Sequence, residues 1–159
     1  MRYPNRRGIA VMSNTVAPEV VKWVRENVSG IDELAGLFFE GAETERKMPR
    51  GAHPAGGGSA WPDIAPDPGL AYGYGEYDPK PSPASSREVT RWDAAIELTR
   101  AMHIDDARLV WRVAFSAVNR ERGPAWTAIG WSYGVTHRVV RQRFRGAMIS
   151  LYYFISHYS

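Results

Sequence analysis

The 159-residue sequence contains no cysteine. This absence excludes disulfide bridges, thiolate zinc sites, iron–sulfur clusters and cysteine nucleophiles, and it favours a cytoplasmic location. No apolar run approaches the roughly 18 residues that a membrane-spanning helix needs, and the basic N-terminus leads only into a short apolar run at 9–12. We therefore expect neither a membrane span nor a signal peptide.

Residue combinations that carry enzymatic chemistry are missing as well. The glycine triplet 56–58 lacks the Lys-Ser/Thr that follows in a phosphate-binding loop. Asp105 and Asp106 precede an apolar helical run, which favours helix capping over catalysis. The histidines show no ligand spacing and predict no metal site; they are His53, His103, His137 and His157. We expect a protein that is not an enzyme and uses no cofactor.

The residues that are present indicate one compact part and one irregular part. Six tryptophans and eight tyrosines supply enough apolar surface for a modest core, whereas 15 glycines and 11 prolines exclude regular structure over part of the chain. Most of these glycines and prolines fall in 41–85, which we predict to be a loop whose aromatic later half lies across the core. Residues 1–14 show no periodicity and are predicted to form a flexible basic arm.

Elsewhere apolar residues recur at three- and four-residue intervals, which predicts an all-α fold. An amphipathic helix is expected within 15–40, where Ser29-Gly30 either kinks it or splits it into two. A helix-turn-helix domain is predicted over 86–159. Its first helix, about 86–102, begins at the capping-box pattern of Ser85 and Glu88.

A core helix follows that is apolar on nearly every side. We predict Asp105 as its N-cap, with Ile104 and Leu109 as a hydrophobic staple. Gly123-Pro124 ends this helix and starts a short one.

The short helix and the residues after it match a helix-turn-helix. Ile129 and Tyr133 are predicted to face inward, and Gly130 is small where the next helix crosses closely. Gly134 is expected to adopt a positive φ at the turn. Thr136 then caps a second helix, whose apolar residues at 140, 144 and 148 define a buried stripe.

Charge makes the opposite face of that second helix a candidate DNA surface. Segment 87–159 holds 11 arginines, no lysine and six acidic residues, of which Glu121 is the last. Arg138, Arg141 and Gln142 are the candidate base readers, because arginine pairs with guanine and glutamine with adenine. The full predicted DNA-binding set is Thr136, His137, Arg138, Arg141, Gln142, Arg143 and Arg145, of which the last two are expected to contact phosphates.

Two resemblances support this interpretation. Segment 136–151 is similar to the last helix of region four of bacterial sigma factors, through Val140-Arg141-Gln142, Ala147-Met148 and Leu151. Residues 60–159 resemble an uncharacterised family of short helix-turn-helix proteins of prophages and their hosts, and residues 18–40 match it more weakly. The similarity is carried by Trp61-Pro62-Asp63-Ile64, Tyr72-Gly73-Tyr74, Leu109-Val110-Trp111 and 126–145. The sequence departs from the sigma-factor pattern at two places. Arg143 stands where the sigma-type helix has an apolar residue, and the insert 119–123 lengthens the approach to the short helix.

These resemblances imply a DNA-associated role in a phage or in regulation. We expect a prophage or host transcriptional regulator that binds double-stranded DNA. The alternative is a small terminase-like packaging protein, or an adaptor that uses the same helix against an acidic protein.

Two aromatic groups remain to be interpreted. The tryptophans at 92, 111, 126 and 131 lie on helical apolar stripes and are predicted to belong to the core, in preference to stacking on single strands. The apolar tail 148–158 is too short to span a membrane and too apolar to stay bare. We expect it to pack on the N-terminal helix; the alternative is a homodimer formed through this tail.

Overall fold

The computed structural model describes residues 16–48, 82–118 and 120–158. The fold is all-α, as predicted, and these residues contain no strand. The helices are α1 (Pro18–Asn27), α2 (Ile31–Lys47), α3 (Ser86–Thr99), α4 (Ile104–Ala117), α5 (Trp126–Tyr133) and α6 (His137–His157). The predicted arm at 1–14 and most of the predicted loop, including its aromatic residues, lie outside the described residues.

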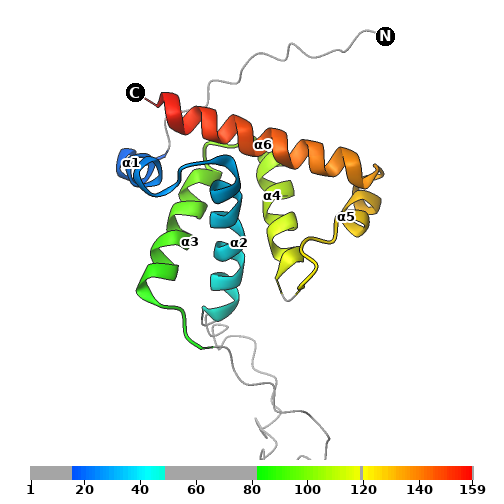
Figure 1. Ribbon diagram of the computed structural model, residues 1–159, viewed down its shortest axis with the longest axis horizontal. Coiled ribbons are helices and arrows are strands. Elements are labelled where there is room, and N and C mark those ends of the chain that lie inside the picture. The colour runs from blue at the N-terminus through cyan, green and yellow to red at the C-terminus, as the bar shows by residue number, and fades with distance from the viewer. Residues whose placement is uncertain (1–15, 49–81, 119, 159) are drawn as a thin grey trace, which may run out of the picture.

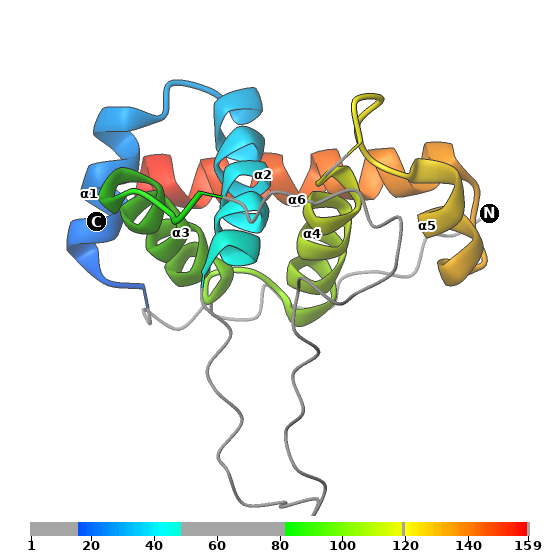
Figure 2. The same cartoon turned by 90° about the horizontal axis from the view of Figure 1, so that it is seen from below.

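The long helix α6 organises the molecule. It runs across the ends of α2, α3 and α4, with α1 beside its C-terminal end and α5 beside its N-terminal end (Figures 1 and 2). At 21 residues it is about 32 Å long, enough to cross a small domain. One continuous helix therefore connects the main bundle to the predicted DNA-binding end.

The main core lies between α1, α2, α3, α4 and the C-terminal half of α6. Phe38 is fully buried there and meets Trp111 edge to face, with ring centroids 5.4 Å apart. The Trp111 indole donates a hydrogen bond of 2.9 Å to the Thr99 hydroxyl, which satisfies its polar atom. The N-terminal helices thus belong to the same core as the C-terminal ones.

Ser29-Gly30 splits the predicted N-terminal helix into α1 and α2, one of the two expected outcomes. The Glu33 carboxylate accepts hydrogen bonds from the Ser29 amide (2.7 Å) and hydroxyl (2.9 Å), which holds the connection. The predicted end at residue 40 is wrong, because α2 continues to Lys47. The added turns bury Gly41, Ala42 and Thr44, and Gly41 leaves room for the Trp111 ring, which would lie 3.3 Å from a Cβ at that position.

The predicted start of α3 is confirmed, since Ser85 and Glu88 form a complete capping box. The predicted cap of α4 is wrong. His103 holds the N-cap position and accepts from the Asp105 amide, while Ile104 is 58% exposed and forms no staple. Helix α4 also ends at Ala117, ahead of the predicted stop at Gly123-Pro124.

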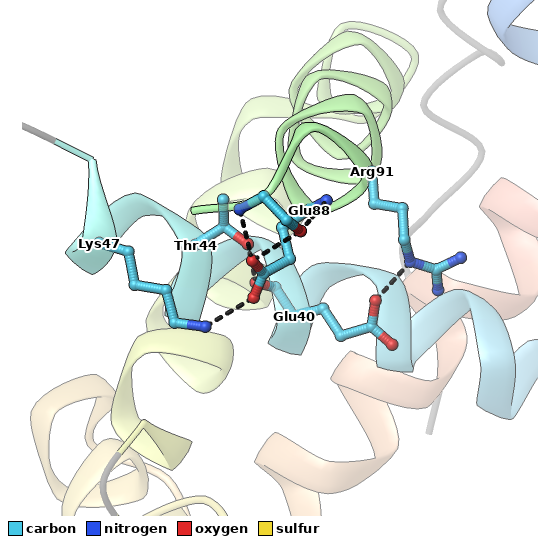
Figure 3. A network of polar contacts seen from close by, with 6 residues as sticks. Glu40, Thr44, Lys47, Glu88 and Arg91 are labelled. Atoms are coloured by element: carbon cyan, nitrogen blue, oxygen red, sulfur yellow. Dashed lines mark hydrogen bonds and ion pairs between the residues drawn. The ribbon is translucent and has the colours of Figure 1, made fainter. Parts of the chain in front are cut away.

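A polar network fastens the C-terminal half of α2 to the start of α3 (Figure 3). The Lys47 ammonium lies 2.6 Å from the Glu88 carboxylate, and Arg91 pairs with Glu40. Hydrogen bonding, first from Lys47 and then from the Ser85 amide and hydroxyl, lowers the pKa of Glu88 to about 2. The same Glu88 carboxylate thus serves both the helix cap and the interhelical ion pair.

The C-terminal tail packs within the chain, as expected. The Arg25 side chain of α1 donates to the Ile155 carbonyl at 2.7 Å and also to the carbonyls of Ser156 and Tyr158. The Tyr158 hydroxyl in turn donates to the Val16 carbonyl at 3.2 Å. The Arg25 bonds satisfy carbonyls that the end of α6 leaves without helical partners.

Candidate nucleic-acid interface

A small second core holds α5 against α4 and the start of α6. Its buried members are Leu109, Val113, Ile129 and Val140, none more than 6% exposed. Phe144 of α6 packs against it and meets the Trp126 ring edge to face, with centroids 5.6 Å apart. Three helices around their own apolar centre give the N-terminal end of α6 a fixed orientation.

Two glycines allow the tight turn between α5 and α6. Gly134 has φ +65°, a left-handed conformation that residues with a Cβ rarely adopt. A Cβ on Gly130 would lie 2.6 Å from the Val135 carbonyl oxygen, and the Val135 amide donates to the Gly130 carbonyl at 3.0 Å. Both glycine roles predicted from the sequence are confirmed.

The basic segment, residues 136–145, is the start of α6 and lies at the surface. All seven residues of the predicted DNA-binding set are exposed: Thr136, His137, Arg138, Arg141, Gln142, Arg143 and Arg145. Thr136 occupies the N-cap position but its side chain makes no capping hydrogen bond, which corrects the prediction that it caps the helix. The amides of the first turn therefore keep their hydrogen-bonding capacity.

Helix geometry divides the basic side chains among three directions. Arg138, Gln142 and Arg145 follow at intervals of four and three residues and share the outward face. Arg141 lies on one flank, where its guanidinium carbon is 5.3 Å from the Trp126 ring centroid. Arg143 lies on the other flank and lines a cavity of about 330 Å³ together with acidic side chains of α4, Asp105 and Asp106.

The electrostatic consequence is an uneven basic surface. No acidic residue follows Glu121 in the sequence, so nothing on α5 or α6 neutralises the outward face. Among the described residues, no carboxylate forms an ion pair with the arginines of the basic segment. Arg143 shares its cavity with the carboxylates of Asp105 and Asp106, which weakens it as a phosphate contact.

Two aromatic predictions on α5 are wrong. Trp131, predicted to be a core residue, is 81% exposed, and Tyr133, predicted to face inward, is 39% exposed with Arg112 over its ring at 5.3 Å. Trp126 packs against the second core and Trp111 against the main core, as predicted. Trp92 is partly covered but belongs to neither core cluster. Helix α5 has only eight residues and apolar side chains in most directions, so its pattern did not show which face is buried.

Trp131 borders a basic groove that the sequence did not indicate. The groove has a volume of about 520 Å³ and is lined by Arg120, Arg122, Trp126, Trp131, His137 and Arg141, among others. In the sequence, the only feature that could have indicated this groove is the pair Arg120 and Arg122 in the link before Pro124. No cluster of metal-ligating side chains, and no helix long and apolar enough to cross a bilayer, occurs in the part of the chain that the structure describes.

Fold and surface together define an all-α protein whose longest helix presents an exposed basic N-terminal half. Residues 46–151, more than half of the chain, match the model of a family described as a domain of unknown function (DUF6362), and the chain belongs to that family. The match spans α3 to α5 and most of α6. The expectation of an uncharacterised family is confirmed, while the phage setting and the sigma-factor resemblance stay predictions. No curated protein and no solved structure matches the chain.

Proposed function

We propose that this protein binds double-stranded DNA by placing the basic segment of α6 in the major groove, as a cytoplasmic transcriptional regulator of a prophage or its host. One observation carries the proposal. The start of α6 exposes all seven predicted DNA-binding residues on a helix that a separate small core holds in place. An α-helix fits the major groove, and preorganised side chains lose little conformational entropy on binding.

The arrangement favours separate tasks for the exposed side chains. Arg138 and Gln142 lie on the outward face, where they can meet guanine and adenine edges, and Arg141 reaches the same groove from the flank of Trp126. The uncapped first turn and Thr136 favour a phosphate contact. Arg145, one turn further along, is suited to a second phosphate, and Arg143 contributes least because of its acidic neighbours.

A packaging or interaction adaptor is the second candidate, and one observation favours it. Ile149 and Tyr153, four residues apart on α6, are 46% and 64% exposed. Such a pair of apolar side chains suits contact with protein, including a second copy of this chain. The inner face of the tail is already covered by α1, so a homodimer would have to use this outer pair.

Selection of bound sequences from a random duplex pool at moderate salt tests the DNA proposal. We expect an enriched motif for the wild type, and a palindromic motif if two copies bind together. The Arg138→Ala/Arg141→Ala double variant should enrich no motif. Arg46→Ala/Arg87→Ala removes the same charge from exposed positions on α2 and α3 and should select like the wild type. Equal selection by wild type and the Arg138/Arg141 variant would overturn the base-reading assignment.

A further inference from the structure

The groove beside Trp131 is formed by well-defined elements of the described part of the chain. Its floor is formed by α5, its rim by the link at 120–125 and by the start of α6. The link is held in place, because the Ala125 amide donates to the Ser116 hydroxyl of α4 at 3.1 Å and the Gly123 amide donates to the Arg120 carbonyl at 3.0 Å. A volume of about 520 Å³ is large enough for a ligand of nucleotide size.

Trp131 is the most exposed large apolar side chain among the described residues, at 81%. The neighbouring Trp126 is half-buried, and Arg141 lies against the Trp126 ring. Trp131 therefore offers a bare indole face to the groove and to solvent. A paired base inside a duplex cannot use such a face, whereas an unpaired base can stack on it whatever its identity.

The remaining groove chemistry suits the phosphate of the same nucleotide. Arg120, Arg122 and Arg141 contribute three guanidinium groups, and the only acidic residue of 119–159 is Glu121. Guanidinium groups bind phosphate oxygens in a bidentate way. An aromatic ring beside several arginines is the composition by which proteins hold single-stranded nucleic acid.

The groove is continuous with the basic segment. Trp131 and His137 also line a neighbouring groove that includes Thr136 at the start of α6. We propose that a nucleotide of an unpaired DNA strand, leaving a duplex that α6 contacts, stacks on Trp131 with its phosphate held by Arg120 and Arg122. This inference rests on the proposed DNA binding and adds a preference for duplexes that end in, or open into, a single strand.

Titration of the full-length protein with labelled 30-base-pair duplexes of mixed sequence at low salt tests the inference. One duplex is blunt and the other carries a six-nucleotide oligo(dT) extension. For the wild type we expect the extension to raise the affinity about fivefold or more, the gain of roughly one stacked base. Trp131→Ala should lose this gain and bind the blunt duplex within about twofold of wild type, while Trp131→Phe should retain most of it.

Tyr153→Ala is the matched control, because Tyr153 is another exposed aromatic side chain but lies near the C-terminal end of α6 and does not line the groove. It should leave the gain unchanged. An extension that adds no affinity, or a Trp131→Ala variant that binds both duplexes like the wild type, would overturn the inference. A wild-type protein that does not bind the blunt duplex would overturn the proposed function instead. The two failures are distinguishable, because the blunt duplex tests the proposed function and the difference between the two duplexes tests the inference.

Discussion

At the residue scale, the two glycines beside the turn set the position of the basic segment. Gly134 supplies a left-handed backbone and Gly130 permits backbone contact between α5 and the residues that precede α6. A side chain at position 130 would push the start of α6 away from α5, whereas one at position 134 would have open space but would strain the left-handed backbone. The direction in which Arg138 and Gln142 point therefore depends on Gly130 and Gly134, which have no side chain that could contact DNA.

Gly130→Ala should destabilise the protein by about 1–3 kcal/mol, because its Cβ would meet backbone atoms that cannot rotate away. Thermal and denaturant unfolding measure this change. Gly146→Ala is the matched control on α6: it has open space for a Cβ within a helix, so it should stabilise the protein by up to about 1 kcal/mol. Equal stability of the two variants would contradict the tight turn.

Single arginine substitutions separate base reading from phosphate contact. Arg141→Ala should relax the preferred base at one position and cost about 1–3 kcal/mol of binding on the selected sequence. Arg145→Ala should weaken binding to all sequences alike and reduce the slope of log affinity against log salt by about 0.9. Competition binding at several salt concentrations checks both; a sequence-dependent loss for Arg145→Ala would reverse the assignment.

At the scale of the elements, α6 serves two cores at once. Val140 lies in the small core with α4 and α5, whereas Met148, Leu151 and Ile155 lie in the main core. The pair α2 and α3 is the most strongly connected part of that main core and is fastened by the network of Figure 3. Because α2 also contacts α6, this network helps to hold the helices on which the C-terminal half of α6 packs.

The Lys47–Glu88 pair predicts how this support depends on pH. The pKa of Glu88 is lowered from 4.5 to about 2 in the folded protein, so its stabilising contribution is complete above about pH 4.5 and is lost as the pH falls toward 2. Lys47→Met removes the main cause of the shift. Melting temperatures over pH 2–6 should fall less steeply for this variant than for wild type.

Arg46→Met is the control for that experiment, since Arg46 is the exposed neighbour on the same last turn of α2. It should keep the wild-type slope. A Lys47→Met slope equal to that of wild type would show that the ion pair contributes nothing to acid stability.

At the scale of the whole molecule, α1 anchors the far end of α6. The Arg25 side chain binds the carbonyls of Ile155, Ser156 and Tyr158, although these residues are more than 125 positions away in the sequence. Arg25→Met should cost about 1 kcal/mol of stability and speed hydrogen exchange in the last turn of α6, with exchange at α5 unchanged.

Lys22→Met, another exposed cation of α1, should leave hydrogen exchange in that last turn as it is in the wild type. Uniform acceleration over the whole of α6 in Arg25→Met would mean that the two halves of this helix do not respond independently. In that case the small core around Val140 would not hold the basic segment by itself.

The sequence alone determined the features that depend on neighbouring residues. The capping box of Ser85 and Glu88, the positive φ of Gly134 and the close approach at Gly130 follow from local backbone chemistry, and each is confirmed. The exposure of the basic segment was also predictable, because an arginine-rich helix stretch with one apolar stripe can bury only that stripe.

Only the tertiary structure decided what depends on distant partners. Trp131 is exposed because only one face of the short α5 packs against the second core, and Ile129 is the residue buried on that face. Arg141 and Arg143 differ because Trp126 lies beside one and the start of α4 beside the other. Burial and electrostatic environment are properties of packing between segments, so two side chains of the same type two residues apart acquire different surroundings that no local pattern contains.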